Sequence, residues 1–147
     1  MNIKKTRIVL IVALMLFSVE VYAACIGSSP TWTSTPDYAS VSSCVSSASP
    51  EDTINVSADS ATGTNTLTIT EGINLRGAGI GNTVLTCSAS PCISYEPSSS
   101  ARPHNFAFRL SGFTFDLGGD SRALILHNSN DLVNKQTKVR IDNNRFY

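Results

Sequence analysis

Short runs of alternating apolar and polar residues occupy most of the chain after Pro50. Such runs predict β-strands, because successive side chains of a strand point to opposite faces. β-branched and aromatic residues dominate the runs, and Gly, Asn, Ser or Pro separates them, as expected for strands joined by turns. The expected strands cover 53–56, 66–70, 73–75, 83–85, 106–110, 113–115, 124–126 and 139–141. The pattern indicates an all-β fold and leaves a sandwich, a barrel or a solenoid open.

The segment just before Pro50 has a helical pattern instead. Asp37 follows Pro36 and is placed to cap a helix over 37–49, which Pro50 would end. The apolar positions recur at intervals of three and four residues: Val41, Cys44, Val45 and Ala48. Because the other positions are rich in Ser, this helix needs an apolar surface to lie on.

Two segments of the chain repeat each other and narrow the choice of fold. Residues 108–115 and 139–146 share the order apolar, Arg, apolar, two small or turn-forming residues and a later Phe, at an offset of 31. Residues 73–77 fit as an earlier copy. Each copy reads as strand, corner and strand, and repetition at this period is typical of a solenoid. The chain has no Asn-Gly or Asp-Gly dipeptide that would favour hairpins, so we expect stacked parallel coils.

The order of these elements also matches a known pattern. After Trp32 come the helix, the strand Asp52-Thr53-Ile54-Asn55-Val56 and the segment 67–79, which reads Leu-Thr-Ile-Thr-Glu-Gly-Ile-Asn-Leu-Arg-Gly-Ala-Gly. This stretch of about 50 residues resembles the N-terminal region of proteins of the pectin lyase-like superfamily. The resemblance implies a right-handed parallel β-helix whose first coil is capped by the helix. It implies no single activity, since the superfamily includes lyases, hydrolases, epimerases, phage tailspikes and adhesive surface proteins.

The N-terminus has the features of an export signal. Three basic residues precede the apolar run 8–17, and Val21 and Ala23 stand at the −3 and −1 positions that signal peptidase reads. We therefore predict a signal peptide over 1–23 with cleavage after Ala23. The mature chain is expected to be secreted, periplasmic or on the cell surface, with no membrane span.

Two alternatives to cleavage are weaker. A retained membrane anchor would need about twenty apolar residues, and lipidation at Cys25 would need an aliphatic residue where Tyr22 stands. With the leader removed, the chain divides into an N-terminal arm or linker (24–36), the capping helix (37–49) and the coils (50–147). No capping segment follows the last coil, so we expect an N-terminal fragment, with further coils or a partner at the open C-terminal end.

Four cysteines follow the leader: Cys25, Cys44, Cys87 and Cys92. An even set in an exported chain favours disulfides, and three pairings are open. We favour Cys25–Cys44, which would pin the arm, and Cys87–Cys92, which would close a small loop. A zinc site would need further ligands, and no His stands beside Cys87 or Cys92.

The net charge argues against a nucleic-acid partner, and the pattern of glycines at 77–82 argues against a dinucleotide site. Beyond residue 23 the chain has 8 basic and 10 acidic residues, a net charge of −2, and its 124 residues suffice for one domain. Nucleic-acid binding requires a surplus of Lys and Arg, so no nucleic-acid partner is expected. The run Gly-Ala-Gly-Ile-Gly-Asn at 77–82 lacks the third glycine of a dinucleotide site and leads into a strand. We expect it to turn a coil corner.

Two arginines are the candidate binding residues. Arg109 and Arg140 occupy equivalent positions of the repeat, so they should point outward and stack on neighbouring coils. A solvated face is the simpler interpretation of such a pair. If the pair is a binding strip, an acidic polysaccharide suits it, because guanidinium groups bind carboxylates through paired hydrogen bonds.

The acidic residues and histidines give weaker signals. Asp116 and Asp120 bracket a Leu-Gly-Gly turn, and Asp142 is expected one coil away. Carboxylates around a glycine-rich turn suit a hard cation, so a calcium site is one interpretation and a solvated turn the simpler one. No other cofactor is predicted. His104 and His127 lack a Ser or Cys partner in a recognisable arrangement, and we interpret each as an exposed or coil-corner residue.

Function is the least determined property. The leading hypothesis is a non-catalytic, exported β-helix segment that acts in carbohydrate binding or surface attachment, with a polysaccharide as partner. The resemblance implies an alternative, the N-terminal fragment of a polysaccharide lyase or glycoside hydrolase whose catalytic coils lie beyond Tyr147. Hydrolases of this fold carry an Asn-Thr-Asp segment, an Asp-Asp pair and a Gly-His-Gly segment, and none occurs here. A structural stalk that carries another domain is a third interpretation.

Overall fold

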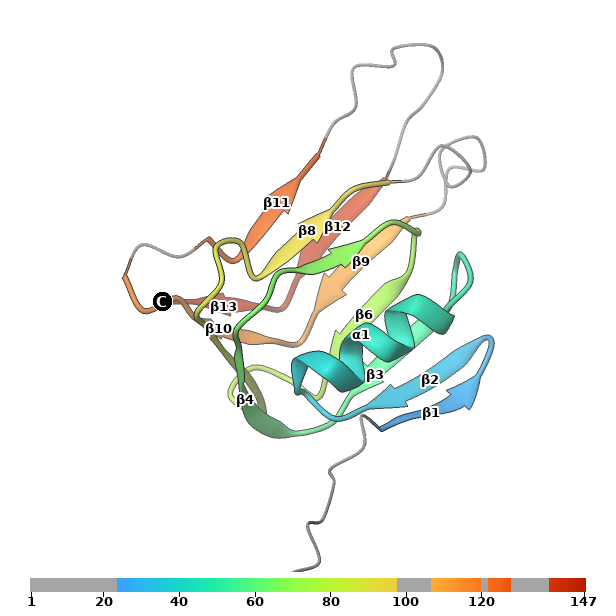
Figure 1. The fold of residues 1–147 in the computed structure, drawn as a ribbon, viewed down its shortest axis with the longest axis horizontal. Helices are drawn as coiled ribbons and strands as arrows, with labels where there is room; N and C mark the ends of the chain where they lie inside the picture. Colours follow the sequence, from blue (N-terminus) through green and yellow to red (C-terminus); the bar gives the residue numbers. More distant parts are fainter. Residues whose placement is uncertain (1–23, 98–106, 120–121, 128–137) are drawn as a thin grey trace, which may run out of the picture.

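The computed structural model describes residues 24–97, 107–119, 122–127 and 138–147 of the chain. These residues form thirteen short strands and one helix, α1 (Tyr38–Ser47) (Figure 1). The strands are β1 (Cys25–Ser28), β2 (Thr31–Ser34), β3 (Thr53–Val56), β4 (Asp59–Gly63), β5 (Leu67–Ile69), β6 (Asn74–Gly77), β7 (Thr83–Cys87), β8 (Ile93–Tyr95), β9 (Phe108–Ser111), β10 (Thr114–Asp116), β11 (Leu124–Leu126), β12 (Val139–Asp142) and β13 (Arg145–Phe146). The eight expected strands correspond to β3, β5, β6, β7, β9, β10, β11 and β12.

The strands build three sheets that the chain visits in turn. Sheet A has the order β1-β2-β3-β6-β9-β12, sheet B has β13-β10-β7-β4, and sheet C has β11-β8-β5. Each of the triplets β3-β4-β5, β6-β7-β8 and β9-β10-β11 is one coil, and β12 and β13 begin the next. All neighbouring strands in the described residues are parallel except β1 and β2. The fold is a right-handed parallel β-helix, as the sequence predicts.

The register of the strands confirms the repeat. Val139 lies beside Phe108 in sheet A, and Phe146 lies beside Phe115 in sheet B, so both pairs keep the offset of 31 residues. In the preceding coil Leu75 lies beside Leu110. One apolar stack therefore runs along the inner side of sheet A: Trp32, Ile54, Leu75, Leu110 and Ile141.

Aromatic rings fill the interior between the sheets. Phe108, Phe113 and Phe115 are almost completely buried. The ring centroids of Tyr95 and Phe108 lie 4.5 Å apart in a stacked arrangement, and those of Phe115 and Phe146 lie 5.2 Å apart. Such pairs add to the stability gained from burial alone. The interior is therefore an ordinary packed core, not a channel.

Helix α1 packs against β1 to β5 and so covers the first coil. Asp37 caps it, because its Oδ1 accepts a hydrogen bond of 2.9 Å from the backbone N–H of Ser40. Val41 and Cys44 are buried on the side that faces the core, as the helical pattern predicts. The helix shields the end of the apolar interior that the first coil would otherwise expose.

The segment 24–36 differs from the arm that its composition suggests. β1 and β2 form an antiparallel hairpin, and β2 pairs with β3 in parallel, so the segment extends sheet A by two strands. The Asp52 carboxylate holds this hairpin. It accepts hydrogen bonds from Ser29 Oγ (2.7 Å), Trp32 Nε1 (2.8 Å) and the backbone N–H of Ser49 (2.9 Å). A buried carboxylate thus joins the hairpin turn, β2 and the residues after the helix.

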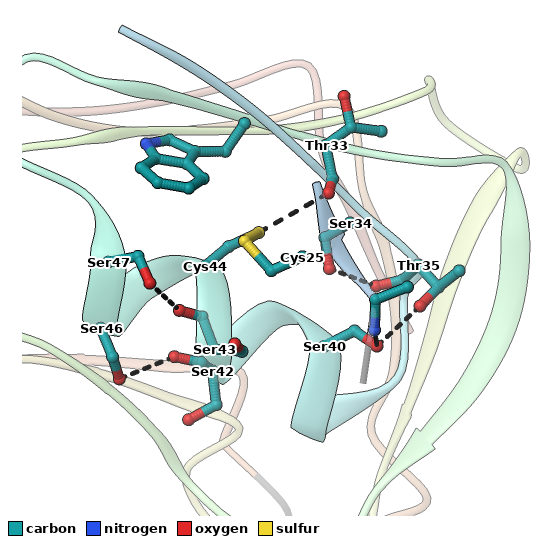
Figure 2. Close-up of a disulfide and its surroundings, with 12 residues drawn as sticks. Cys25, Thr33, Ser34, Thr35, Ser40, Ser42, Ser43, Cys44, Ser46 and Ser47 are labelled. Atoms are coloured by element: carbon teal, nitrogen blue, oxygen red, sulfur yellow. Dashed lines mark hydrogen bonds between the residues drawn. A yellow bond between two sulfur atoms is a disulfide. The ribbon is translucent and has the colours of Figure 1, made fainter. Parts of the chain in front are cut away.

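Both favoured disulfides are formed. The Cα atoms of Cys25 and Cys44 are 5.2 Å apart and those of Cys87 and Cys92 are 5.7 Å apart, within the range for a disulfide. Figure 2 shows Cys25–Cys44, which links the hairpin to α1. Two disulfides are typical of proteins in an oxidising compartment, extracellular or periplasmic.

The described residues contain no helix with the length and apolar character needed to cross a membrane. The predicted signal peptide over 1–23 lies outside the described residues, and its cleavage stays a prediction.

Candidate functional site

The outer face of sheet A carries two rows of stacked side chains. Strand alternation places them on either side of the inward apolar stack. The first row consists of Thr31, Thr53, Asn74, Arg109 and Arg140. The second row consists of Thr33, Asn55, Arg76, Ser111 and Asp142. Both rows begin with neutral hydroxyl and amide groups near the helical cap and become charged toward the last coil. We call this surface the arginine face.

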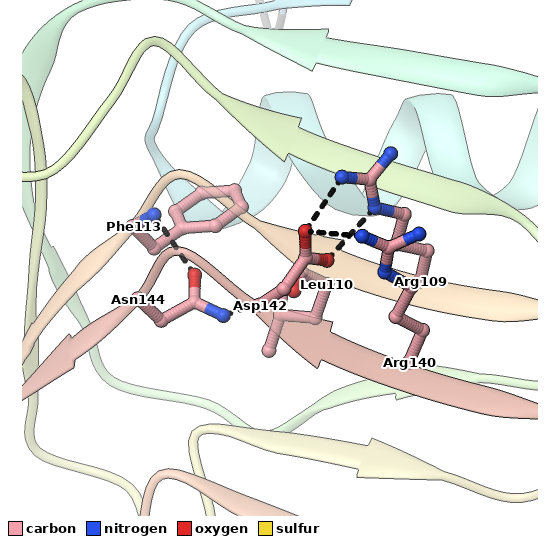
Figure 3. Close-up of polar contacts among 6 residues, drawn as sticks. All are labelled: Arg109, Leu110, Phe113, Arg140, Asp142 and Asn144. Atoms are coloured by element: carbon pink, nitrogen blue, oxygen red, sulfur yellow. Dashed lines mark hydrogen bonds and ion pairs between the residues drawn. The ribbon is translucent and has the colours of Figure 1, made fainter.

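Arg109 and Arg140 are direct register partners, as the repeat predicts. They do not stand as two independent cations, because both contact Asp142 (Figure 3). Arg109 makes a bidentate contact, with Nη2 2.7 Å from Oδ2 and Nε 2.9 Å from Oδ1. Arg140 Nη2 lies 3.2 Å from the same Oδ2. One carboxylate therefore bridges arginines from two coils.

The charges of this cluster are fixed over a wide pH range. The hydrogen bonds from Arg109, and the charges of both arginines, hold the pKa of the Asp142 carboxyl below its ordinary value. The same hydrogen bonds raise the pKa of Arg109. At neutral pH the three groups have a net charge of +1. The Arg140 side chain is 67% exposed and that of Arg109 is 35% exposed, so solvent or a ligand can reach both guanidinium groups.

Arg76 adds a second positive charge, and the sequence analysis did not single it out. Its side chain is exposed and makes no hydrogen bond or ion pair with the residues that the structure describes. In the register Leu75 matches Leu110, so Arg76 takes the place of Ser111 and not that of Arg109. The preceding coil therefore presents its arginine in the second row. Aligning residues 73–77 with the later repeat so that Leu75 matches Leu110 places Arg76 beside Ser111 on the outer face.

Two hollows flank Arg76 on this face. The larger has a volume of about 510 Å³ and is lined by Arg76, Gly77, Ala78, Gly79, Ile80, Arg109, Ser111, Gly112 and Asn143. The smaller has a volume of about 360 Å³ and is lined by Thr33, Asn55, Val56, Ser57, Arg76, Gly77 and Ala78. The two hollows are neighbours, because both are lined by Arg76, Gly77 and Ala78.

Glycines allow the backbones of neighbouring coils to approach closely at the coil corner beside these hollows. Gly77 and Gly112 lie against each other on neighbouring coils, and a Cβ at either position would overlap the other's backbone. Gly79 and Gly81 have φ angles of +127° and +81°, which other residues rarely adopt. The glycine-rich run thus turns a coil corner and continues into β7, as predicted.

The other predicted site residues do not join this cluster. Asp116 ends β10 in sheet B, where it lies beside Thr86, whereas Asp142 lies beside Ser111 in sheet A. Asp142 therefore lies in the next coil, as expected, but on a different sheet, so the two carboxylates are not register partners. Asp116 Oδ1 accepts a hydrogen bond of 3.3 Å from the Gly118 N–H.

The calcium site stays a prediction because Asp120 lies outside the described residues. Within the described ranges no group of three or more His, Cys, Asp or Glu side chains could hold a metal ion. His127 is exposed, with Nε2 3.7 Å from Glu96 Oε1, and His104 lies outside the described residues.

Comparison with known proteins returns no match: no family model, no curated protein and no solved structure is significantly similar to this chain. The chain is therefore characterised by its architecture, a solenoid of three parallel sheets with a helical cap and an arginine face.

Proposed function

We propose that this chain is an exported, non-catalytic β-helix protein of the pectin lyase-like type that binds an acidic polysaccharide on its arginine face. The assignment to that type rests on the order of the capping helix, the Asp-Thr-Ile-Asn-Val strand and the glycine corner. Export is supported by the two disulfides and by the leader sequence. The ligand class follows from the side chains of sheet A.

The observation that carries the proposal is the exposed guanidinium of Arg76 between two hollows. A guanidinium group binds a carboxylate or sulfate through two parallel hydrogen bonds, and Arg76 has no competing partner in the described residues. The hydroxyl and amide groups of Thr33, Asn55 and Asn143 line the same hollows. They suit the hydroxyl groups of a sugar ring, which are both donors and acceptors.

The state of Asp142 argues against one catalytic role at this face, that of a general acid. A general acid must hold a proton near neutral pH, and its pKa must therefore be raised. Asp142 instead pairs with two arginines, which keep its pKa below the ordinary value. Its carboxylate holds Arg109 and Arg140 in place for a ligand.

Replacing Arg76 with Gln should weaken binding of polygalacturonate by at least about tenfold, since a charge-assisted hydrogen bond contributes roughly 1.5–3 kcal/mol and 1.4 kcal/mol is a factor of ten. Isothermal titration calorimetry at low salt measures this change. Binding to the unsubstituted chain should also weaken as salt is added, because the attraction between exposed charges is screened.

The matched control is Arg145→Gln, which makes the same charge change on sheet B at a residue that lines neither hollow. It should leave the affinity within about twofold of the original. Dextran, which has no charge, should bind much more weakly than polygalacturonate. Equal losses for the two variants, or equal binding of the two polysaccharides, would refute the proposal.

A further inference from the structure

The residue that the predicted cleavage would make the N-terminus lies against the start of α1. The backbone nitrogen of Ala24 is 2.9 Å from Ser40 Oγ, and Ser40 is completely buried. Cleavage after Ala23 would convert this nitrogen from an amide, which has one N–H and no charge, into an α-amino group. The group that export would create therefore has a hydrogen-bond acceptor already in place.

This acceptor belongs to a polar network at the first turn of the helix. The hydroxyl oxygens of Ser40 and Thr35 each lie 2.6 Å from Asp37 Oδ2. The two hydroxyl oxygens are 2.8 Å apart, and Figure 2 shows their contact. When both hydroxyl groups donate to the carboxylate, Ser40 Oγ keeps its lone pairs for Ala24. Burial raises the pKa of Asp37, but the hydrogen bonds from Ser40 and Thr35 outweigh burial and lower it, so the carboxylate is charged at neutral pH.

Two constraints hold Ala24 at this place. The next residue, Cys25, is bonded to Cys44 of α1, and it also pairs with Ser34 in the hairpin of β1 and β2. The nitrogen of Ala24 is therefore kept near the start of the helix by covalent and backbone bonds. Because the site and its occupant are preorganised, little conformational freedom is lost when they bind.

We propose that Thr35, Asp37 and Ser40 form a binding site for the charged α-amino group that leader removal creates on Ala24. Hydrolysis adds water across the Ala23–Ala24 bond: the carbonyl carbon takes the hydroxyl group, and the nitrogen takes the hydrogen. At neutral pH the new carboxyl group releases its proton and the new amine gains one. The resulting ammonium donates to Ser40 Oγ and is attracted by the Asp37 carboxylate. The positive end of the α1 dipole disfavours a cation here, so binding depends on that carboxylate.

This site would couple removal of the leader to the stability of the fold. The mature chain gains an attraction between charges that the precursor lacks, because the precursor has a neutral amide at the same position. The inference rests on the export part of the proposed function, since it requires the predicted cleavage. It is independent of polysaccharide binding on the arginine face.

Processing of the chain and modification of its amine test the site. The full chain is produced with its own leader in a bacterium, and sequencing of the exported product should begin at Ala24. Acetylation of the α-amino group at pH 6.5, where lysine side chains are protected by their protons, removes the charge. It should lower the melting temperature by about 3 °C.

Reductive dimethylation of the same amine is the matched control, because it adds similar bulk but keeps the positive charge. It should lower the melting temperature by less than about 1 °C. A product that begins at Ala24 but loses as much stability on dimethylation as on acetylation would overturn the amine site alone. A product that keeps its leader or begins elsewhere would overturn the predicted cleavage as well.

Asp37→Asn separates the charge of the site from the helix cap. Asn caps helices as well as Asp does, so the helix should still begin there, but the ammonium loses its carboxylate. Acetylation should then no longer lower the melting temperature, since the helix dipole alone disfavours the charge. Asp116→Asn makes the same charge change on β10, two strands from β4 in sheet B, and should keep the loss of about 3 °C on acetylation. Equal losses on acetylation of the two variants would overturn the proposal.

Discussion

Gly112→Ala is expected to lower the free energy of unfolding by about 4 kcal/mol, from backbone strain and a steric overlap together. Gly112 has a φ angle of +81°, which residues with a Cβ rarely adopt. The added Cβ would also lie 2.6 Å from the carbonyl oxygen of Gly77, a backbone atom on the next coil. Because both atoms belong to stacked coils, relief requires the coils to separate. Urea denaturation followed by the fluorescence of Trp32, the single tryptophan of the chain, measures the loss.

Gly63→Ala provides the control for this experiment. Gly63 lies at the end of β4, and a Cβ there would meet no atom within 4 Å. The change in unfolding free energy should stay below about 1 kcal/mol. Similar losses of unfolding free energy at Gly63 and Gly112 would contradict the close contact between the Gly77 and Gly112 backbones.

Asp52→Ala is expected to lower the free energy of unfolding by about 3 kcal/mol. The substitution removes an acceptor of three hydrogen bonds and leaves the Trp32 indole N–H and the Ser49 backbone N–H without their partner. Asp59→Ala is the matched control, because Asp59 is exposed and, among the described residues, accepts a hydrogen bond from the adjacent Ser60 N–H alone. Urea denaturation of the two variants should separate them by at least about 2 kcal/mol. Equal effects would contradict the anchoring role of Asp52.

The same carboxylate predicts how stability depends on pH. Burial alone would raise the pKa of Asp52, but the hydrogen bonds from Trp32, Ser49 and Ser29 outweigh burial and lower it. The unfolded-state pKa of Asp is about 3.9, so this contribution is complete above that pH and is lost as pH falls through the lower folded-state value. The original chain should therefore lose more stability than Asp52→Ala between neutral pH and pH values below about 4. An equal loss in both would exclude Asp52 as a source of the acid sensitivity.

Much of the fold follows from the sequence because stacked coils make equivalent residues similar. The offset of 31 residues alone predicts the pairing of Val139 with Phe108 and of Phe146 with Phe115. The cap followed from Asp37 and the helical spacing of Val41 and Cys44. These features depend on the spacing of nearby residues and on the repeat, and both can be seen in a single sequence.

The strands that the sequence analysis missed lack the alternating pattern for physical reasons. β4 reads Asp-Ser-Ala-Thr-Gly and is largely exposed, so its place depends on backbone pairing with β7 and not on an apolar face. β8 reads Ile-Ser-Tyr and is buried at all three positions, including Ser94 at 3% exposure. β1 and β2 are rich in Ser and Thr and depend on Asp52 and the Cys25–Cys44 disulfide.

The candidate site was predictable only where the repeat is regular. Arg109 and Arg140 share an offset of 31 and were expected to be neighbours. Asp142 reaches both of them through side-chain geometry, which spacing alone does not give. Arg76 belongs to a coil at an offset of 35, set by the pairing of Leu75 with Leu110, so a search at the offset of 31 misses it, although aligning the two leucines places it on the same face.

The central claim is that an acidic polysaccharide binds to the arginine face. Its most direct test is a titration of the ¹⁵N-labelled chain with an oligogalacturonate, followed through backbone amide chemical shifts. We predict that the largest shifts cluster on the corner of sheets A and B, at Arg76, Gly77, Ser111 and Gly112. Shifts centred on sheet C, around Thr68 and Ser94, or no shifts at all, would contradict it.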